Sequence, residues 1–434
     1  MHSTIKNLLF SLAWLISAAC IGCKKNNGFS HNSGQPIAIS SFSPATGPIG
    51  TEILIKGSNF SSDTSQVKVS INGIALLVVG VKGDEIMAVV TEKTGTGPVV
   101  VSIDKTTGTS SDLYNYVFSY TVSTLAGSGT AGYNDGSGTG ASFNFNGVRG
   151  QLSVDQNLNV YVADGGNQRI RKIAADGTVT TIAGSGTNGY QDGNATAAQF
   201  NNPCGTAVDN NGNIYVSERN GRNIRKITPD GVVSTWAHSN GNGGNELTSV
   251  VINNTTGAVY WSDFYGDGIY ELVNGSVQKV INHSLPCTIT IDGQGNLYAT
   301  HYDDETVIKY TYNSAADTFD NGTVLAGTSH VAGMDDGIGT NATFARPWGI
   351  AIDAKNTLYV SGQGGGDNSN CVRMITADTW NVTTIAGLGN NTGYIDGLGG
   401  DARFNQPTGI TVDKNGNLYI LDMGNNRIRK ITVQ

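Results

Sequence analysis

Short runs of apolar residues alternate with polar turns along most of the chain, and the stretch from Gly409 to Ile431 shows the pattern most plainly. Apolar or β-branched residues dominate at 409–412, 418–421 and 427–431, and the residues between them are rich in Asp, Asn and Gly. Runs of this length separated by such turns are typical of short β-strands. The stretch therefore predicts a three-stranded meander, which needs neighbouring units to bury its faces.

This unit recurs along the chain from about residue 120. Its first turn is marked by an acidic or amide residue at six places: Asp155, Asp209, Asn253, Asp292, Asp353 and Asp413. A tyrosine-bearing strand follows each turn, and a third strand such as RIRKI at 427–431 follows that. The units resemble NHL repeats, above all in GNLYILDMGNNRIRKI. NHL repeats form β-propellers, so the resemblance implies blades of four antiparallel strands.

Each blade then needs a fourth, outer strand. Five such strands follow their third strands directly: Val179–Ala183, Val232–Ala237, Val277–Ile281, Thr323–Ala326 and Val382–Ala386. The sixth unit has no sequence left for one, but an unpaired strand of the same type lies upstream at Thr121–Ala126. Pairing the two ends of the ring would remove an exposed edge. We therefore expect an all-β fold with a six-bladed propeller over 120–434, closed by this N-terminal outer strand.

Residues 37–119 read as a separate β-domain of short strands and turns. The stretch from Ile39 to Phe60 resembles the opening of IPT/TIG domains. The shared residues include Pro44, Gly47, Gly50 and Gly57. The resemblance implies an immunoglobulin-like sandwich that acts as a spacer or a dimer module.

Residues 1–23 are similar to an export signal, with Lys6 ahead of an apolar run that is too short to span a membrane comfortably. The run ends in AACIGCKKNN, which resembles a bacterial lipoprotein signal. Cys23 is the expected lipidation site and Cys20 the alternative; a cleaved signal without lipid is the remaining interpretation. Residues 24–36 are rich in Pro, Gly, Ser and Asn and are expected to form a flexible tether. The protein would then be anchored by lipid at the bacterial outer membrane or cell surface.

Four elaborate loops precede inner strands and share an Asp-Gly pair followed eight residues after the Asp by a phenylalanine. The pairs are Asp135–Phe143, Asp192–Phe200, Asp336–Phe344 and Asp396–Phe404. We expect the Asp side chains to cap backbone N–H groups and the Phe rings to fill the gaps between blades. Calcium is the alternative for the Asp residues, although the loops lack the several carboxylates of a calcium site. Tyrosines precede three of the turns and are candidate exposed ligand contacts: Tyr133, Tyr190 and Tyr394.

Two rings of residues are expected near the mouth of the central channel. Trp348, Thr248 and Thr408 begin inner strands, and a tryptophan there is either a plug or a stacking platform. The second ring follows the second strands and comprises Asp164, Glu218, Asp263, His301 and Asp422, with Gly362 in the fifth unit. These residues are candidate ligand contacts; the alternative is that they hydrogen-bond to the neighbouring blade.

Composition narrows the function classes. The net charge of −8 argues against binding of nucleic acid, which depends on Lys and Arg. No nucleophile elbow or Ser-His-Asp arrangement is present, so no catalytic residue is predicted.

Peptide-amidating lyases with this type of propeller hold zinc through histidines. Here His238, His283, His301 and His330 are expected on different blades, so no metal site or cofactor is predicted and zinc stays an alternative.

These observations favour a surface-anchored binding protein without catalysis, whose propeller face binds a glycan or a protein. Aromatic faces flanked by Asp, Asn and Gln suit sugars, and the domain order resembles surface proteins of Bacteroidetes-type bacteria. The alternative is a metal-dependent lyase or lactonase-like hydrolase on the same propeller, with carboxylates such as Asp164 and Asp422 around a central metal.

Overall fold

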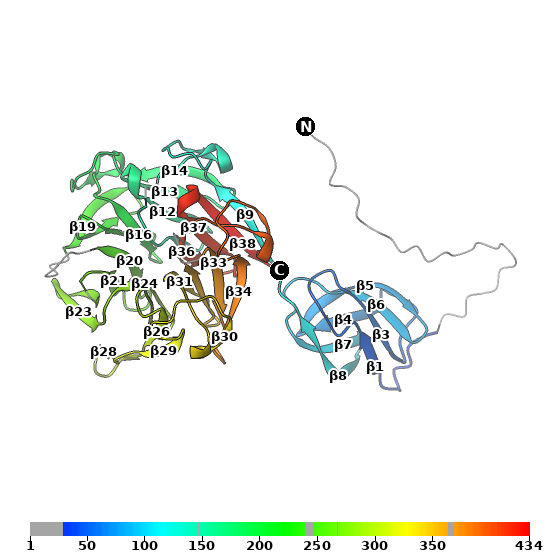
Figure 1. The fold of residues 1–434 in the computed structure, drawn as a ribbon. Helices are drawn as coiled ribbons and strands as arrows, with labels where there is room; N and C mark the ends of the chain where they lie inside the picture. The colour runs from blue at the N-terminus through cyan, green and yellow to red at the C-terminus, as the bar shows by residue number, and fades with distance from the viewer. Residues whose placement is uncertain (1–28, 146, 239–245, 267, 363–368) are drawn as a thin grey trace. The chain divides into compact units, whose positions relative to one another are not determined.

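The computed structural model describes residues 29–434 except 146, 239–245, 267 and 363–368. Cys20, Cys23 and the predicted signal at 1–23 lie outside the described residues. The chain divides into two compact units, with the boundary between Val117 and Phe118 (Figure 1). Each unit is all-β, and no described helix is long and apolar enough to cross a membrane.

The first unit is an immunoglobulin-like sandwich whose strands are joined in the order β1-β3-β6-β5-β4-β7-β8-β2; all pairs are antiparallel except β2 with β8, which is parallel. Alternate residues of its strands point into one core, which includes Ile53, Ile55 and Val101. The strands are β1 (Ala38–Ser43), β2 (Thr46–Gly47), β3 (Glu52–Ser58), β4 (Val67–Ile71), β5 (Ile74–Lys82), β6 (Glu85–Val89), β7 (Gly97–Ile103) and β8 (Thr106–Tyr116).

The tether predicted at 24–36 is corrected at its C-terminal end. The side-chain amide of Asn59 donates to the backbone carbonyls of Asn32 and Gln35, and the backbone N–H of Ser62 donates to the carbonyl of Phe29. Asn59 adopts a positive φ of 65°, which turns the chain so that its side chain can reach this segment. Residues 29–36 are therefore hydrogen-bonded to the first unit and do not form a free linker.

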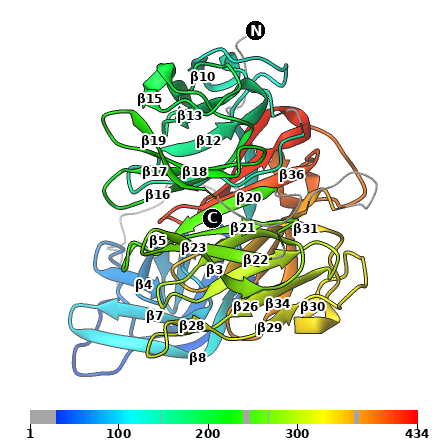
Figure 2. The same ribbon diagram turned by 90° about the vertical axis from the view of Figure 1, so that its left-hand side faces the viewer.

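The second unit is the expected six-bladed propeller, and its blades can be followed from two directions in Figures 1 and 2. Each blade runs from an inner strand at the central axis to an outer strand, and the inner strands of consecutive blades are in contact. From inner to outer, blade one has β11 (Ser153–Val154), β12 (Val160–Asp164), β13 (Arg169–Ile173) and β14 (Thr178–Ala183), and blade two has β16 (Pro203–Val208), β17 (Ile214–Glu218), β18 (Asn223–Ile227) and β19 (Val232–His238). Blade three has β20 (Leu247–Ile252), β21 (Val259–Asp263), β22 (Gly268–Val273) and β23 (Ser276–Asn282), and blade four has β24 (Pro286–Ile291), β25 (Leu297–His301), β26 (Thr306–Tyr310) and β29 (Thr323–Ala326). Blade five has β31 (Pro347–Ile352), β32 (Leu358–Gly362), β33 (Cys371–Ile375) and β34 (Asn381–Gly387), and blade six has β36 (Pro407–Val412), β37 (Leu418–Asp422), β38 (Arg427–Val433) and β9 (Tyr120–Ala126). A small hairpin of β27 (Tyr312–Asn313) and β28 (Thr318–Phe319) extends from blade four.

The ring closes as the sequence predicts. Strand β9 pairs antiparallel with β38, with Thr121 opposite Thr432 and Ala126 opposite Ile428. The first propeller strand thus becomes the outer strand of the last blade. The inner strands β11 and β36 are also in contact, so blade one follows blade six around the axis.

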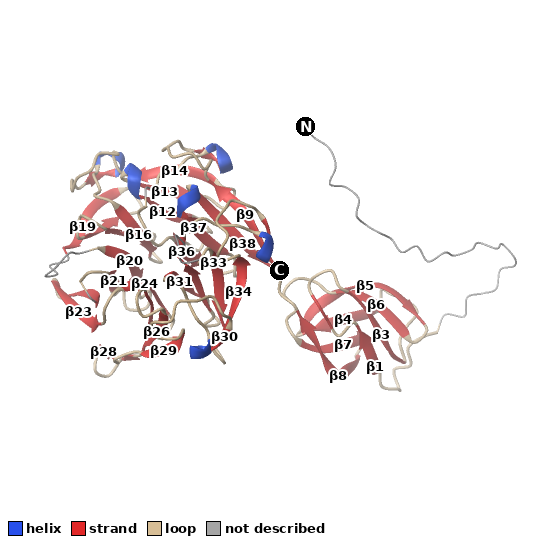
Figure 3. Cartoon of the chain, in the orientation of Figure 1, coloured by secondary structure: helices blue, strands red, loops and turns tan. Residues whose placement is uncertain are grey.

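The four Asp-Gly loops add a feature that the sequence did not reveal. Each contributes a two-residue strand to the outer edge of its blade: β10 (Gly136–Ser137), β15 (Gly193–Asn194), β30 (Gly337–Ile338) and β35 (Gly397–Leu398). A short 3-10 turn follows each strand, and these turns are among the few helical segments in Figure 3: Gly138–Gly140, Ala195–Ala197, Gly339–Asn341 and Gly399–Asp401. Two further 3-10 turns, Gly165–Asn167 and Met423–Asn425, follow β12 and β37.

The phenylalanine of each loop fills the space between two blades, as expected. Phe143 packs in a cluster with residues of blades six and one, such as Leu421 and Val162. Phe200 lies between blades one and two, Phe344 between blades four and five, and Phe404 between blades five and six. Each ring is buried, so the phenylalanine end of each loop is part of the core.

Candidate ligand-binding face

We call one end of the propeller the loop face. It is formed by the loops from outer to inner strands and from second to third strands. The repeated Asx turns, in which Asp413 accepts the N–H groups of Asn415 and Asn417, join inner to second strands at the other end. All candidate contact residues of the propeller belong to the loop face.

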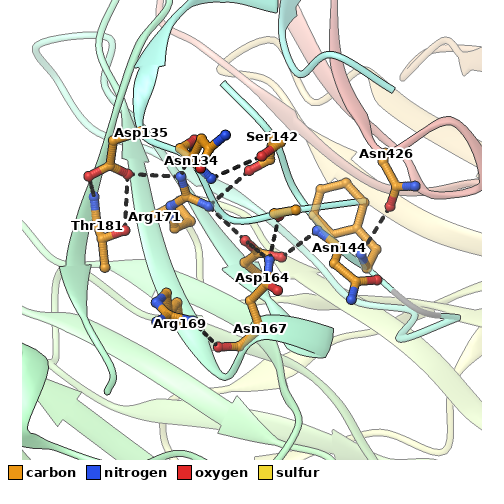
Figure 4. Close-up of polar contacts among 12 residues, drawn as sticks. Asn134, Asp135, Ser142, Asn144, Asp164, Asn167, Arg169, Arg171, Thr181 and Asn426 are labelled. Atoms are coloured by element: carbon orange, nitrogen blue, oxygen red, sulfur yellow. Dashed lines mark hydrogen bonds and ion pairs between the residues drawn. The ribbon is translucent and has the colours of Figure 1, made fainter. Parts of the chain in front are cut away.

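A buried arginine organises the loop face of blade one (Figure 4). The guanidinium of Arg171 donates to Asp164 at 2.7 Å on one side and to Asp135 of the Asp-Gly loop at 2.8 Å on the other. It also donates to the carbonyls of Ser142 and Asn134 in the same loop. Its carbon atom Cζ lies 5.1 Å from the centre of the Phe143 ring. One side chain therefore holds together the Asp-Gly loop, the second strand and the Phe143 ring between the blades. We call this arrangement the arginine bracket.

The full bracket recurs in blades two and six, and blade five has its outer half. In blade two Arg225 joins Asp192 at 2.6 Å and Glu218 at 3.2 Å, and in blade six Arg429 joins Asp396 at 2.6 Å and Asp422 at 2.8 Å. In blade five Arg373 contacts Asp336 at 2.8 Å, but Gly362 stands in place of the inner carboxylate.

Blades three and four lack the Asp-Gly loop, and Tyr270 and Ile308 occupy the place of the arginine. The bracket is the feature that sequence reasoning missed. The signal was present, because a third-strand Arg and an Asp-Gly loop occur in the same four blades.

Three carboxylates predicted as ligand contacts are used inside the bracket. The side chains of Asp164, Glu218 and Asp422 are fully buried and each accepts a backbone N–H from the loop that enters its blade, as well as the arginine. Burial raises the pKa of all three, and that of Asp422 to about 6, because desolvation outweighs the hydrogen bonds and the arginine. The predicted role of direct ligand contact is corrected: these groups hold the loops of their own blade, and among the described residues their hydrogen-bond partners lie in that blade and its entering loop.

The Asp residues of the loops cap backbone groups, as expected. Asp135 accepts the backbone N–H of Thr181 at 3.0 Å and its hydroxyl at 3.0 Å. Asp192, Asp336 and Asp396 make the same pair of contacts with Thr235, Thr384 and Thr124. Each loop is therefore tied to the outer strand of its blade as well as to the arginine.

The three candidate tyrosines stand at the surface, with exposed fractions of 58% for Tyr133, 55% for Tyr190 and 41% for Tyr394. The guanidinium carbons of Arg169 and Arg427 lie 4.5 Å and 3.6 Å from the ring centres of Tyr133 and Tyr394. These arginines are themselves held, since both donate to loop carbonyls.

The hydroxyl of Tyr190 accepts from the side-chain amide of Asn201 at 2.7 Å. The three tyrosines belong to blades six, one and two, which are consecutive in the closed ring. The three exposed rings therefore lie on neighbouring blades, and we call this set of residues the tyrosine sector.

Trp348 is a plug and offers no stacking platform. Its side chain has no exposed surface and packs with Phe264 and Cys287, with Tyr302 against the cluster. Thr248 and Thr408 are also fully buried. The hydroxyl of Thr248 donates to the carbonyl of Cys287 in the next blade, and the carbonyl of Thr408 accepts the hydroxyl of Ser361 in the preceding blade. The prediction that these three residues contact a ligand is corrected, because inner-strand residues here pair with neighbouring blades.

Asp263 and His301, the remaining ring residues, are fully buried as well. Asp263 accepts the backbone N–H groups of Glu246 and Gly266. His301 differs from the carboxylates of this ring, which accept backbone N–H groups. Its Nδ1 faces the carbonyl of Ser284, in the loop that enters blade four, at 3.0 Å, and a carbonyl only accepts, so here the ring residue is the donor.

The expectation that the four histidines lie apart on different blades is wrong for three of them. His283, His301 and His330 approach Asp304, whereas His238 lies at the end of β19 in blade two. The reason is topological: each loop from an outer strand crosses to the next blade, so residues from two blades meet on the loop face.

Comparisons with known proteins agree with the two units. Residues 36–120 match the IPT/TIG domain and residues 404–431 match the NHL repeat. A crystal structure of a Bacteroides thetaiotaomicron protein of unknown function is 21% identical, has a TM-score of 0.64, and covers 94% of this chain and 100% of that chain. An auxiliary nutrient binding protein from the same organism is 22% identical, with a TM-score of 0.57 over 93% of this chain and 99% of its own.

Among curated proteins, NHL repeat-containing protein 2 from Bos taurus is 25% identical over 353 residues, covering 66% of this chain and 46% of its own length. The chain thus spans less than half the length of the curated relatives it matches. At these identities the similarity to the solved structures concerns the fold. The chain carries an N-terminal IPT/TIG domain followed by a six-bladed β-propeller of NHL-type repeats.

Proposed function

We propose that this protein is a surface-anchored binding protein without catalysis of its own, and that the tyrosine sector binds a glycan. The observation that carries the proposal is the exposure of Tyr133, Tyr190 and Tyr394 on three consecutive blades. Tyrosine offers a rigid contact surface with one polar end and loses little conformational entropy on binding. Such rings can stack on the C–H faces of sugars while their hydroxyls pair with sugar hydroxyls.

The polar groups around the tyrosines suit the same ligand class. Asn201 bonds to the Tyr190 hydroxyl, and Thr124 bonds to the Tyr394 hydroxyl at 3.2 Å. Amides and hydroxyls both donate and accept, so they can serve the mixed hydrogen-bonding pattern of a carbohydrate. The acidic net charge of −8 makes a polyanionic ligand unfavourable.

The arginine brackets favour binding because they fix the loops before the ligand arrives. Arg171, Arg225 and Arg429 are fully buried and each bonds to the Asp of its tyrosine-bearing loop. A preorganised loop spends less entropy on binding. The likeness in fold to an auxiliary nutrient binding protein supports a role in capturing an external nutrient.

Anchoring through Cys23, with Cys20 as the alternative, completes the proposal. The sequence AACIGCKKNN resembles a lipoprotein signal, and a lipid at its cysteine would retain the protein at the outer membrane or cell surface.

A glycan array tests the binding function. The full chain is compared with a triple variant, Tyr133→Ala/Tyr190→Ala/Tyr394→Ala, and with a matched control, Trp236→Ala, which removes a partly exposed aromatic from outer strand β19. We expect the wild type and the control to bind the same glycans and the triple variant to lose at least about tenfold in affinity, or about 1.4 kcal/mol. Absence of any bound glycan, or equal binding by the triple variant, would refute the proposal.

A further inference from the structure

A cluster of three histidines and one aspartate lies on the loop face of blade four, away from the three blades of the tyrosine sector. His283 precedes β24, His301 ends β25, Asp304 lies in the loop between β25 and β26, and His330 follows β29. One ligating atom each from His283, His301 and Asp304 lies within 4.8 Å of the others. The rings of His283 and His301 are in contact, with centres 4.0 Å apart.

The distances around Asp304 are too long for hydrogen bonds and suit an ion between the groups. Its Oδ2 lies 3.8 Å from Nε2 of His283, and its Oδ1 lies 3.5 Å from Nε2 of His330. Hydrogen bonds of this type are shorter than about 3.2 Å. Two ligands of a tetrahedral zinc ion, each about 2.1 Å from the metal, are separated by roughly 3.4 Å.

The second ring nitrogens support the same assignment. Nδ1 of His301 faces the carbonyl of Ser284 at 3.0 Å, Nδ1 of His330 faces the carbonyl of Asp303 at 3.0 Å, and Nδ1 of His283 lies 3.3 Å from the Ser284 carbonyl. A carbonyl only accepts, so the Nδ1 atoms of His301 and His330 carry the hydrogen and their Nε2 atoms keep the lone pair, whereas the 3.3 Å separation at His283 is longer than such a hydrogen bond. Metal-binding histidines are oriented in this way by backbone carbonyls.

Tyr310 contacts the ligating nitrogen of His301. Its hydroxyl lies 2.9 Å from Nε2 of His301 and donates to that lone pair. Binding of an ion at this nitrogen exchanges this hydrogen bond for a coordinate bond. The side chains of His283 and Asp304 are partly exposed to solvent, by 27% and 23%, so an ion can reach them.

We infer that His283, His301 and Asp304, with His330 as the fourth ligand, bind one divalent transition-metal ion of the zinc class. Imidazole nitrogen suits zinc, copper and nickel, whereas calcium and magnesium prefer oxygen ligands alone. The ion joins three loops, those that hold His283, Asp304 and His330, across the boundaries of blade four. The inference is independent of glycan binding.

Zinc titration of the chelator-treated full chain, followed by calorimetry and by thermal unfolding, tests the inference. We expect one zinc ion per chain and a zinc-dependent rise in melting temperature. His283→Ala and Asp304→Asn should each weaken binding at least about tenfold, whereas His238→Ala, whose ring bonds to Asn223 in blade two, should bind as the wild type does.

Melting curves of the metal-free variants control for folding. Zinc binding that is absent from the wild type, or that survives in both folded site variants, would overturn the inference. Loss of binding in His238→Ala alone would assign the zinc to another site and overturn it as well.

Discussion

Asp396 accepts two hydrogen bonds from Thr124, which lies 272 residues earlier in the chain. The backbone N–H of Thr124 donates at 3.1 Å and its hydroxyl at 3.2 Å, while Arg429 holds the same carboxylate at 2.6 Å. Asp135 makes the equivalent contacts to Thr181 within blade one, where the chain is continuous. The closure of the ring thus reproduces the internal pattern of a blade, including its arginine bracket.

Asp396→Ala should destabilise the propeller more than Asp135→Ala. Strand β9 is attached to β38 only by noncovalent contacts, whereas β13 continues directly into β14. Loss of hydrogen bonds to a charged group costs about 1–3 kcal/mol. At the seam, where β9 pairs with β38 and closes the ring, this loss also loosens strand β9. Thermal unfolding by calorimetry measures both variants. Equal melting temperatures for the two variants would contradict this account of the seam.

The pH dependence of stability should carry a contribution from Asp422. Burial raises its pKa from 3.8 to about 6 in the folded protein, so between these values the folded state holds a proton that the unfolded state has released. The free energy of unfolding contributed by this group therefore falls as pH rises through this window and is constant above it. Asp422→Asn removes this titration. The fall in the free energy of unfolding between pH 4 and 6 should therefore be smaller in the variant, by on the order of 1–3 kcal/mol. Urea unfolding of both proteins across this range provides the measurement; parallel curves would contradict the assignment.

The architecture could be predicted from the sequence because the blade repeat is local and regular. The strand at Thr323–Ala326 and the closing strand at Thr121–Ala126 follow from counting units, and the structure has both. Strand β8 is hard to recognise in the sequence, because Gly108 and Ser110 occupy two of its buried positions and give no apolar alternation.

The ligand face was harder to predict because burial depends on contacts between distant residues. Asp164 and Trp348 occupy positions on the loop face, but Arg171 and Phe264 cover them from other elements. The approach of His283 to His301 depends on a loop that crosses between blades. Tyr133 and its equivalents were found because they stand next to a turn signal in the sequence, which is local.

The three described cysteines should be inert in the folded protein. Burial raises the pKa of Cys204 and Cys371 to about 12 and that of Cys287 well above its usual value, so almost no thiolate forms near pH 8. A chain with Cys20→Ser/Cys23→Ser leaves only these thiols. We expect no reaction with Ellman's reagent at pH 8 in the native state and three reactive thiols after denaturation. Rapid native labelling of any of them would contradict their burial.

Lipid attachment at Cys23 can be measured directly. Expression of the full chain in a lipoprotein-processing bacterium with labelled palmitate should give a labelled, membrane-associated product. Cys23→Ser should abolish the label, whereas Cys20→Ser should retain it. If Cys20→Ser alone abolishes labelling, the anchor is at Cys20; if neither cysteine is labelled in the wild type, the anchor proposal fails.

The joint action of Tyr133, Tyr190 and Tyr394 requires that blades six, one and two be consecutive, which depends on the pairing of β9 with β38. Thr121 lies opposite Thr432 in that pairing, whereas Thr228 occupies the equivalent place in blade two. Cysteines at directly opposed strand positions can form a disulfide, and cysteines far apart cannot.

The most direct measurement is therefore disulfide mapping by mass spectrometry of two oxidised double variants, Thr121→Cys/Thr432→Cys and Thr121→Cys/Thr228→Cys. The account predicts an intramolecular disulfide in the first and none in the second. No link between 121 and 432, or a link between 121 and 228, would show that the ring is not closed as described.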